Sequence, residues 1–138
     1  MALYIAKVEV PPNTPENYPI EKKVQLRGKQ LSKIEYRFPA GVFESVKCRV
    51  TYGNLVLSPK GPYKWVDGED EKVTDEIEWK LPYSRTTVTI QAWSEAEDYP
   101  HTITIRFHVK KELPTEIFER IEWWIRGVAE RIKALLGF

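Results

Sequence analysis

The chain has 138 residues, the length of one domain, and 42% of them are hydrophobic while 30% are charged. This balance is typical of a globular protein and excludes a disordered one. The 21 Lys and Arg residues against 20 Asp and Glu residues leave a net charge of +1, which argues against a protein that coats nucleic acid. We therefore expect no nucleic-acid partner.

The charged residues are biased toward two types. There are 16 Glu and 13 Lys residues against 3 Asn and 3 Gln, and usage rich in charge and poor in amides is a signal of hyperthermophilic proteins. The composition therefore predicts a thermophilic source.

Segments that direct a chain to or through a membrane are not expected. The first twenty residues lack a basic start followed by an apolar core, and no stretch approaches about 18 uncharged apolar residues. We predict neither a signal peptide nor a transmembrane segment. The single Cys48 also excludes an intrachain disulfide.

From Leu3 to Val109 the hydrophobic side chains recur mainly at every second residue. This period is typical of antiparallel strands with one buried and one solvent-facing side. In 46–52 the alternation is clearest, whereas in 73–81 Asp75 falls on the apolar side as an exception. The predicted strands are 3–10, 22–26, 31–38, 46–52, 55–57, 73–81, 88–92 and 103–109.

Turn residues separate these runs. Gly53-Asn54 lies between two apolar runs and predicts a hairpin over 46–58. About eight short strands with turns between them indicate a β-sandwich or barrel. We predict that 1–112 form an antiparallel β-sandwich with Greek-key connections, of the jelly-roll or Ig-like kind.

The segment 11–19 (PPNTPENYP) contains four prolines in nine residues. Proline fixes φ and donates no backbone hydrogen bond, so this segment is predicted to be an extended arm between strands. The arm is either a long crossover connection or a hinge that lets 3–10 join the sheet of a neighbouring subunit.

After Pro114 the period changes to that of a helix, with Thr115 as a candidate N-cap and Gly137 after the end. We predict one amphipathic helix over 113–138, for oligomerisation or docking. A heptad spacing of 3-4-3-4-3 runs from Phe118 to Leu135. The residues predicted to form an oligomer interface are Ile117, Phe118, Ile121, Trp124, Ile125, Val128, Ile132 and Leu135.

Two features of this segment indicate its partner. Isoleucine at both a and d positions (Ile121, Ile125, Ile132) favours trimers or higher oligomers of this chain. Docking on the chain's own sandwich stays open as the alternative. Acidic and basic residues balance on the polar face, whereas helices that bind membrane surfaces are usually rich in Lys and Arg, so a membrane partner is disfavoured.

Motifs that carry enzyme chemistry are missing from the sequence. There is no phosphate-binding glycine loop, nucleophile elbow, zinc motif or CxxC. Cys48 falls on an inward position, His108 on an outward one and His101 in a turn, so all three are predicted to be dispensable. We expect no enzyme activity and no cofactor. An acidic loop offers weak metal candidates at Asp67, Glu69 and Asp70 but does not match an EF-hand.

Aromatic residues outside the core are candidates for ligand or partner contact. Trp93 falls on the outward side of its strand, and Trp65 and Tyr99 lie near turns. Exposed aromatics stack on sugar rings or fill protein interfaces. The alternative is that they cap the ends of the core.

Four stretches carry a family resemblance: 37–41 (RFPAG), 52–54 (YGN), 65–70 (WVDGED) and 96–102 (AEDYPHT). They resemble small β-sandwich structural proteins of tailed and archaeal viruses. The resemblance implies an accessory or adaptor part of a virion, with other virion proteins as partners, and a cytoplasmic or virion location.

Taken with the helix, these observations predict a non-enzymatic structural protein that self-associates. Two alternatives stay open. One is a module that binds glycans or other ligands through exposed aromatics, and the other is a peripheral membrane protein anchored by the helix.

Overall fold

The computed structural model describes residues 2–111 and 127–128. Each predicted strand is present, with bounds that differ by a few residues from the prediction. The strands are β1 (Ala2–Val10), β2 (Ile20–Arg27), β3 (Gln30–Phe38), β4 (Val46–Tyr52), β5 (Leu55–Ser58), β6 (Glu71–Lys80), β7 (Arg85–Ser94) and β8 (His101–Lys110). The helix predicted over 113–138 lies outside the described residues except for Gly127 and Val128.

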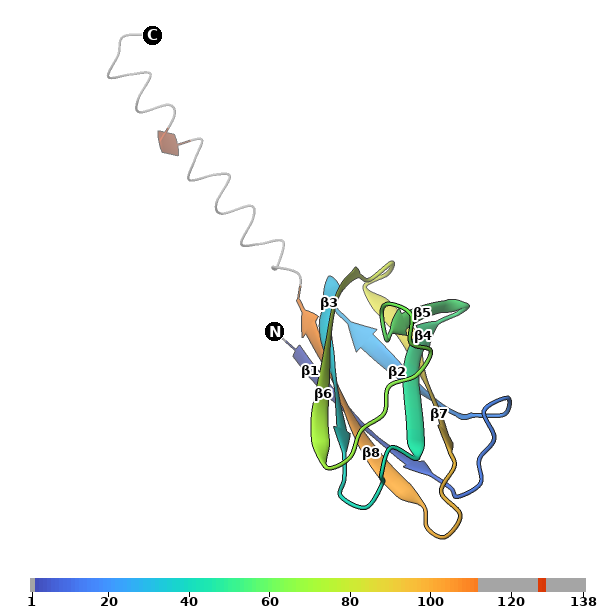
Figure 1. The fold of residues 1–138 in the computed structure, drawn as a ribbon. Coiled ribbons are helices and arrows are strands. Elements are labelled where there is room, and N and C mark those ends of the chain that lie inside the picture. The colour runs from blue at the N-terminus through green and yellow to red at the C-terminus, as the bar shows by residue number, and fades with distance from the viewer. Residues whose placement is uncertain (1, 112–126, 129–138) are drawn as a thin grey trace, which may run out of the picture.

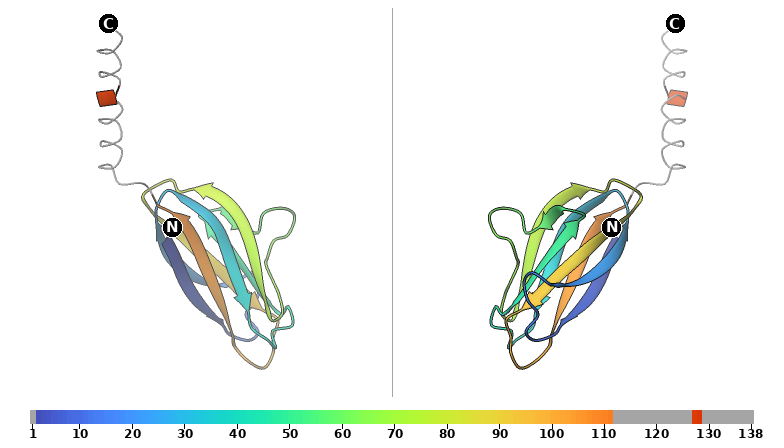
Figure 2. Two further views of the ribbon diagram at one scale, coloured as in Figure 1. Left: turned by 90° about the vertical axis from the view of Figure 1, so that its left-hand side faces the viewer. Right: turned by 90° about the vertical axis from the view of Figure 1, so that its right-hand side faces the viewer.

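The strands form two antiparallel four-stranded sheets that pack against each other. The β1 sheet has the order β1-β8-β3-β6, and the β2 sheet has the order β2-β7-β4-β5. Figure 2 shows the β1 sheet toward the viewer in one view and the β2 sheet in the other. The chain changes sheet at every connection except the β4–β5 hairpin, which contains Gly53 at φ 58°. The antiparallel sandwich predicted from the period-two pattern is therefore confirmed.

The core fills the space between the sheets with the inward side chains of both. In the β1 sheet Ile34 pairs with Phe107, and in the β2 sheet Val50 pairs with Ile90. All four of these side chains are 0% exposed. Cross-strand apolar pairs on the buried face are the unit that stabilises such sheets.

A bulge in β3 changes which residues reach the core. The register of β3 against β6 and β8 shifts between Leu31 and Lys33. Leu31 and Ile34 are consequently both buried although they are three residues apart, which a regular strand does not allow. Beyond the bulge, Lys33 and Glu35 lie on the outer face of the β1 sheet.

Asp75, the polar residue on the apolar side of the 73–81 pattern, has a hydrogen-bond partner on the other sheet. Ser58 Oγ donates a hydrogen bond of 2.6 Å to Asp75 Oδ2, so the half-buried carboxylate has a partner.

Trp79 of β6 is half-buried and packs against Tyr52, with ring centroids 5.2 Å apart. Trp79, which the alternation places in the core, therefore lies at its margin.

The proline-rich arm, 11–19, is the crossover connection from β1 to β2, and β1 pairs with β8 of the same chain. Backbone hydrogen bonds hold the arm against the β7–β8 connection. Asn13 N donates to Ala96 O at 2.8 Å, and Ser94 N donates to Thr14 O at 3.1 Å. The arm is thus a fixed part of the domain surface.

The two ends of the sandwich are formed by different parts of the chain. Ala2 pairs with Val109, so β1 begins and β8 finishes at the same end. The β3–β4 and β7–β8 connections lie at the opposite end (Figure 1). Within residues 2–111 and 127–128, no helix has the length and apolarity needed to cross a membrane.

Candidate functional site

The outer face of the β2 sheet carries the candidate site, and Trp65 is its central residue. Trp65 comes from the connection between β5 and β6. The next residue, Val66, forms an isolated antiparallel bridge with Cys48 of β4, with N–O distances of 2.7 and 2.9 Å. This bridge fixes the backbone beside β4 and holds the indole over the sheet.

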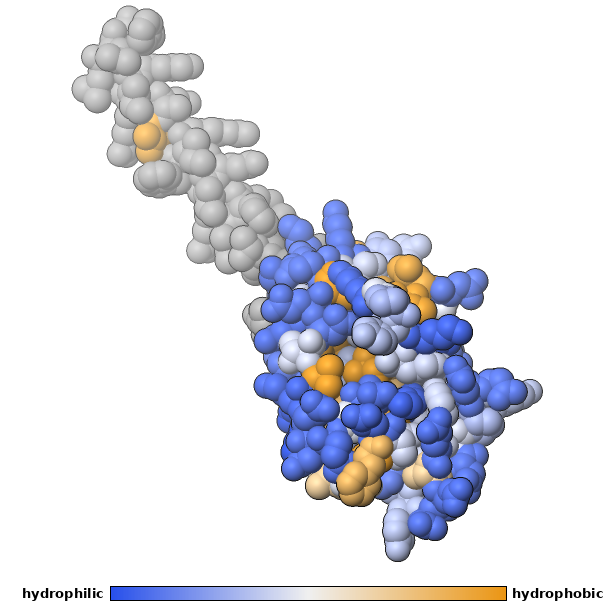
Figure 3. All heavy atoms as spheres, in the orientation of Figure 1, coloured by the Kyte–Doolittle hydropathy of each residue, from blue (hydrophilic) through white to orange (hydrophobic). Residues whose placement is uncertain are grey.

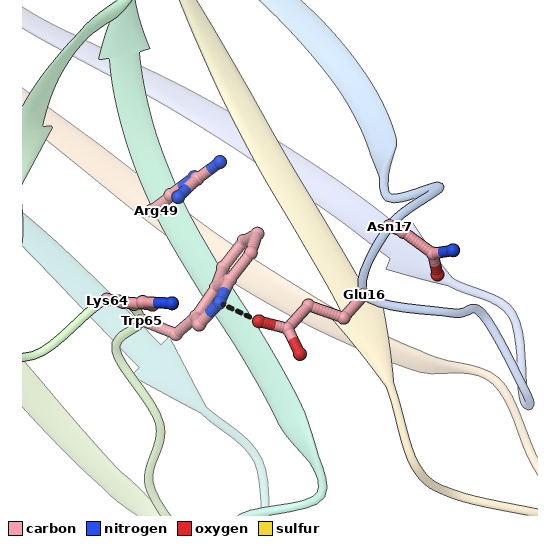
Figure 4. A pocket seen from close by; sticks show the side chains of 5 residues that line it. All are labelled: Glu16, Asn17, Arg49, Lys64 and Trp65. Atoms are coloured by element: carbon pink, nitrogen blue, oxygen red, sulfur yellow. Dashed lines mark hydrogen bonds between the residues drawn. The ribbon is translucent and has the colours of Figure 1, made fainter.

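Trp65 contacts side chains from two adjacent strands. The guanidinium carbon of Arg49 in β4 lies 4.2 Å from the Trp65 ring centroid, a cation–π contact. Trp93 of β7 meets the Trp65 ring edge-on, with centroids 5.9 Å apart and planes at 80°. Figure 4 shows Arg49 beside the Trp65 indole. The aromatic ring is therefore held from two directions.

A row of polar side chains crosses three strands beside this contact. Glu21, Gln91 and Arg49 are register partners on β2, β7 and β4. Arg49 Nε donates to Gln91 Oε1 at 2.7 Å, and Gln91 Nε2 donates to Glu21 Oε1 at 3.0 Å. The row therefore sets the orientation of the Arg49 guanidinium as well as its position.

The proline-rich arm forms the opposite wall of a shallow hollow over Trp65. Trp65 Nε1 donates to Glu16 Oε1 at 3.1 Å (Figure 4). The hollow has a volume of about 500 Å³ and is lined by Glu16, Asn17, Arg49, Lys64 and Trp65. This volume falls within the range of small-ligand sites.

The three aromatic candidates divide between two surfaces. Trp65 and Trp93 meet each other and are half-buried rather than fully exposed. Tyr99 is 71% exposed and lines a separate hollow at the β3–β4 and β7–β8 end. Arg49, Gln91 and Glu16 had no signal in the sequence, because only the strand pairing and the path of the arm bring them to Trp65.

The end with Tyr99 also presents Phe43, which the strand pattern does not mark. Phe43 is 78% exposed and, like Glu44, has a positive φ (49° and 62°). The Glu69 carboxylate accepts hydrogen bonds from Gly41 N, at 2.7 Å, and from Phe43 N. A carboxylate that binds two backbone amides holds the loop in a conformation that non-glycine residues rarely adopt.

The three acidic side chains considered as metal ligands, Asp67, Glu69 and Asp70, each bind a different group of the protein. Asp67 pairs with Lys47 at 2.5 Å, Asp70 pairs with Arg37 at 3.0 Å, and Glu69 holds the 41–43 backbone. In the part of the chain that the structure describes, no group of three or more His, Cys, Asp or Glu side chains is placed to hold a metal ion.

Cys48 and the two histidines lie apart. Cys48 is fully buried, and burial raises the pKa of its thiol to about 12, so the thiol stays protonated and unreactive. His101 is the first residue of β8, where a turn was predicted, and it lines the hollow with Tyr99. His108 lies on the outer face of the β1 sheet, as predicted, where its Nε2 is 3.2 Å from Glu35 Oε1.

Glu35 is an acidic residue surrounded by basic ones on that face. Its side chain is 11% exposed, and Lys33 Nζ lies 3.4 Å from its carboxylate. Burial raises the pKa of this carboxyl, but the charges of Lys72, His108 and Lys33 together outweigh burial and hold the pKa below its usual range.

We expect Glu35→Gln to lower the free energy of unfolding at pH 7 by about 1–2 kcal/mol, because the surrounding cations lose their counter-charge. The folded-state pKa lies below the unfolded one, so the stabilisation is present at neutral pH and is lost as the pH falls through the folded pKa. Urea unfolding at pH 7 and pH 3 measures this. Glu76→Gln, on the same face without an ion pair among the described residues, is the control. Equal losses for both variants would contradict the prediction.

Comparison with known proteins identifies no relative by sequence. No family model matches the chain, and no curated protein matches it. One solved structure that resembles it is a family two carbohydrate esterase from Cellvibrio japonicus, at 10% identity and a TM-score of 0.32. The match covers 82% of this chain and 37% of that chain. At this TM-score the likeness carries no argument about function.

Proposed function

We propose that this protein is a non-enzymatic structural protein that self-associates through 113–138. The observation that carries the proposal is that the large exposed hydrophobic side chains of residues 2–111 lie on the edge strands β1 and β5 and in connections, not across an outer sheet face. The two sheets of the sandwich bury their apolar sides against each other. A helix with the broad apolar face predicted for 113–138 must bury that face somewhere, since large apolar side chains gain about 1.5–3 kcal/mol each on burial.

The outer faces of both sheets are mainly polar. On the β1 sheet Lys33, Glu35 and Arg37 pair with His108, Arg106 and Thr104. On the β2 sheet Glu21 and Lys23 pair with Gln91 and Thr89. Leu3 and Ile5, at one edge, are the large exposed hydrophobics of the outer β1 face. Figure 3 shows a face of the domain where hydrophilic side chains surround separate apolar patches. Such surfaces favour packing of 113–138 against other copies.

The order of the strands in the two sheets supports the proposed structural role. The orders β1-β8-β3-β6 and β2-β7-β4-β5 combine two Greek keys in eight strands, and we infer a jelly roll from them, the architecture of many viral capsid and lectin domains. This architecture agrees with the virion role implied by the sequence resemblance. Fold alone does not determine function, so the proposal rests on the assembly test.

Sedimentation velocity of the full chain tests self-association. We expect the mass of a trimer or higher oligomer, and Ile125→Asp should lower that mass while the β-sheet circular dichroism signal is retained. Lys133→Gln, on the predicted polar face, lowers the net charge by the same one unit and should leave the mass unchanged. A wild-type monomer at high concentration overturns the proposal. Loss of the β signal in Ile125→Asp also overturns it, because the segment would then belong to the domain's own core.

A second candidate function is ligand binding by the β2 sheet. The hollow over Trp65 favours it, because an aromatic ring lies there with a guanidinium, an ammonium, a carboxylate and an amide. Hydroxylated rings such as sugars bind sites of this composition.

A further inference from the structure

We propose that the hollow over Trp65 binds acidic carbohydrate, with Arg49 receiving the carboxylate of a uronic acid unit. This inference rests on the second candidate function and is independent of self-association. It starts from the state of Arg49, which is oriented by two contacts that leave its terminal nitrogens uncommitted.

The first contact is with Trp65 and the second is with Gln91. The Trp65 ring covers one face of the guanidinium at 4.2 Å, and Gln91 Oε1 accepts from Nε at 2.7 Å. Gln91 is held in turn by Glu21. A guanidinium fixed in this way loses little conformational entropy when it forms two parallel hydrogen bonds to a carboxylate.

The terminal nitrogens have no acidic partner within the described domain. Its ion pairs involve Lys33, Arg37, Lys47, His108 and Lys110, and none includes Arg49. The contrast with Lys47 on the same strand is informative, because Lys47 is neutralised by Asp67 at 2.5 Å. Among the described residues, no carboxylate pairs with the Arg49 guanidinium, which lies beside an aromatic ring.

The charge of the hollow favours an anion. Arg49 and Lys64 supply two positive charges against the one carboxylate of Glu16, which already accepts from Trp65 Nε1 at 3.1 Å. The whole chain has a net charge of only +1, so this local excess is not a consequence of general basicity.

The rest of the lining suits a sugar ring that bears the acid. Glu16 offers acceptor oxygens, and Asn17 offers both a donor and an acceptor, next to the Trp65 ring. Vicinal hydroxyls can bond to these groups while the carboxylate binds Arg49. A neutral sugar would leave the Arg49 charge unmatched and should bind more weakly.

Isothermal titration calorimetry of the full chain provides the test, with tetragalacturonic acid, its methyl ester and neutral galactotetraose as probes. We expect the acid to bind about tenfold or more tightly than either neutral probe, because charge-assisted hydrogen bonds are lost with the ester. Arg49→Gln should remove most of this preference, with the remainder due to Lys64, and Arg49→Lys should restore it only in part because the planar fork is absent.

Two variants keep the test decisive. Lys64 is exposed, so Lys64→Gln should weaken acid binding without affecting folding, even if Arg49→Gln is unstable in thermal melts. Arg27→Gln, on the outer face of β2 and outside the hollow, should bind like the wild type. The inference is overturned if the ester and the acid bind equally tightly. It is also overturned if Arg27→Gln loses as much affinity for the acid as Lys64→Gln does. Binding of tetraglutamate as tightly as the sugar acid would overturn it too. Binding of no saccharide would overturn ligand binding by this face as well.

Discussion

Replacing Phe107 with alanine is expected to destabilise the sandwich by about 3–5 kcal/mol, because it removes a large buried ring and leaves a cavity. Phe107 is 0% exposed and pairs with Ile34 across the centre of the β1 sheet. Single domains are stable by only about 5–15 kcal/mol. The variant should therefore lose a large part of its total stability and show a much lower denaturation midpoint.

Phe43 offers a matched control for this prediction. Its side chain is identical but 78% exposed in the β3–β4 connection, so Phe43→Ala should change the free energy of unfolding by about 0.5 kcal/mol or less. Guanidinium chloride unfolding, followed by circular dichroism, compares the two. Similar losses in both variants would show that Phe107 does not lie in the core described above.

Substitution of Gly28 should produce the second large effect. Gly28 joins β2 to β3 with φ 148°, and a Cβ there would lie 2.5 Å from Val109 Cγ1 and 2.8 Å from the Lys110 carbonyl oxygen. That oxygen accepts a hydrogen bond of 2.7 Å from Lys29 N, so it has little freedom to move away. We expect Gly28→Ala to cost about 2–4 kcal/mol, through backbone strain and overpacking together.

Gly41→Ala separates the two causes. Gly41 also has a positive φ, of 92°, but nothing lies within 4 Å of its added Cβ. This variant should show the cost of backbone strain alone, about 1 kcal/mol or more. Thermal and urea unfolding of both variants measure the difference. If Gly41→Ala is as unstable as Gly28→Ala, the clash with β8 contributes nothing.

The strands were predictable because burial of one sheet face imposes a period of two on the sequence. Val46, Cys48 and Val50 show that period without interruption, and all three are buried. The order of strands within each sheet was not predictable, since it depends on partners distant along the chain. The bulge at Ser32 was also hidden, because it changes the phase of β3 without any glycine or proline to mark it.

The candidate site was likewise predictable only in part. Trp65 and Trp93 were recognisable as aromatics outside the regular core pattern, but 28 positions separate them in sequence. Their contact depends on the bridge between Cys48 and Val66 and on the pairing of Lys47 with Trp93. Arg49 looked like an ordinary outward residue of a strand, and its stacking on Trp65 and its hydrogen bond to Gln91 distinguish it.

β1 begins and β8 finishes at the same end of the sandwich. In any assembly joined through 113–138, every sandwich would therefore be attached by that same end. Copies joined through 113–138 would all be tethered at the end where β8 finishes, with Phe43 and Tyr99 at the far end of each copy. Each copy would also carry its own hollow over Trp65. A polymer of repeated acidic units could then bridge several hollows, and avidity of this kind raises apparent affinity by about 10²–10⁴ without any new contact. Weak recognition by a single domain would then suffice for tight attachment of such an assembly.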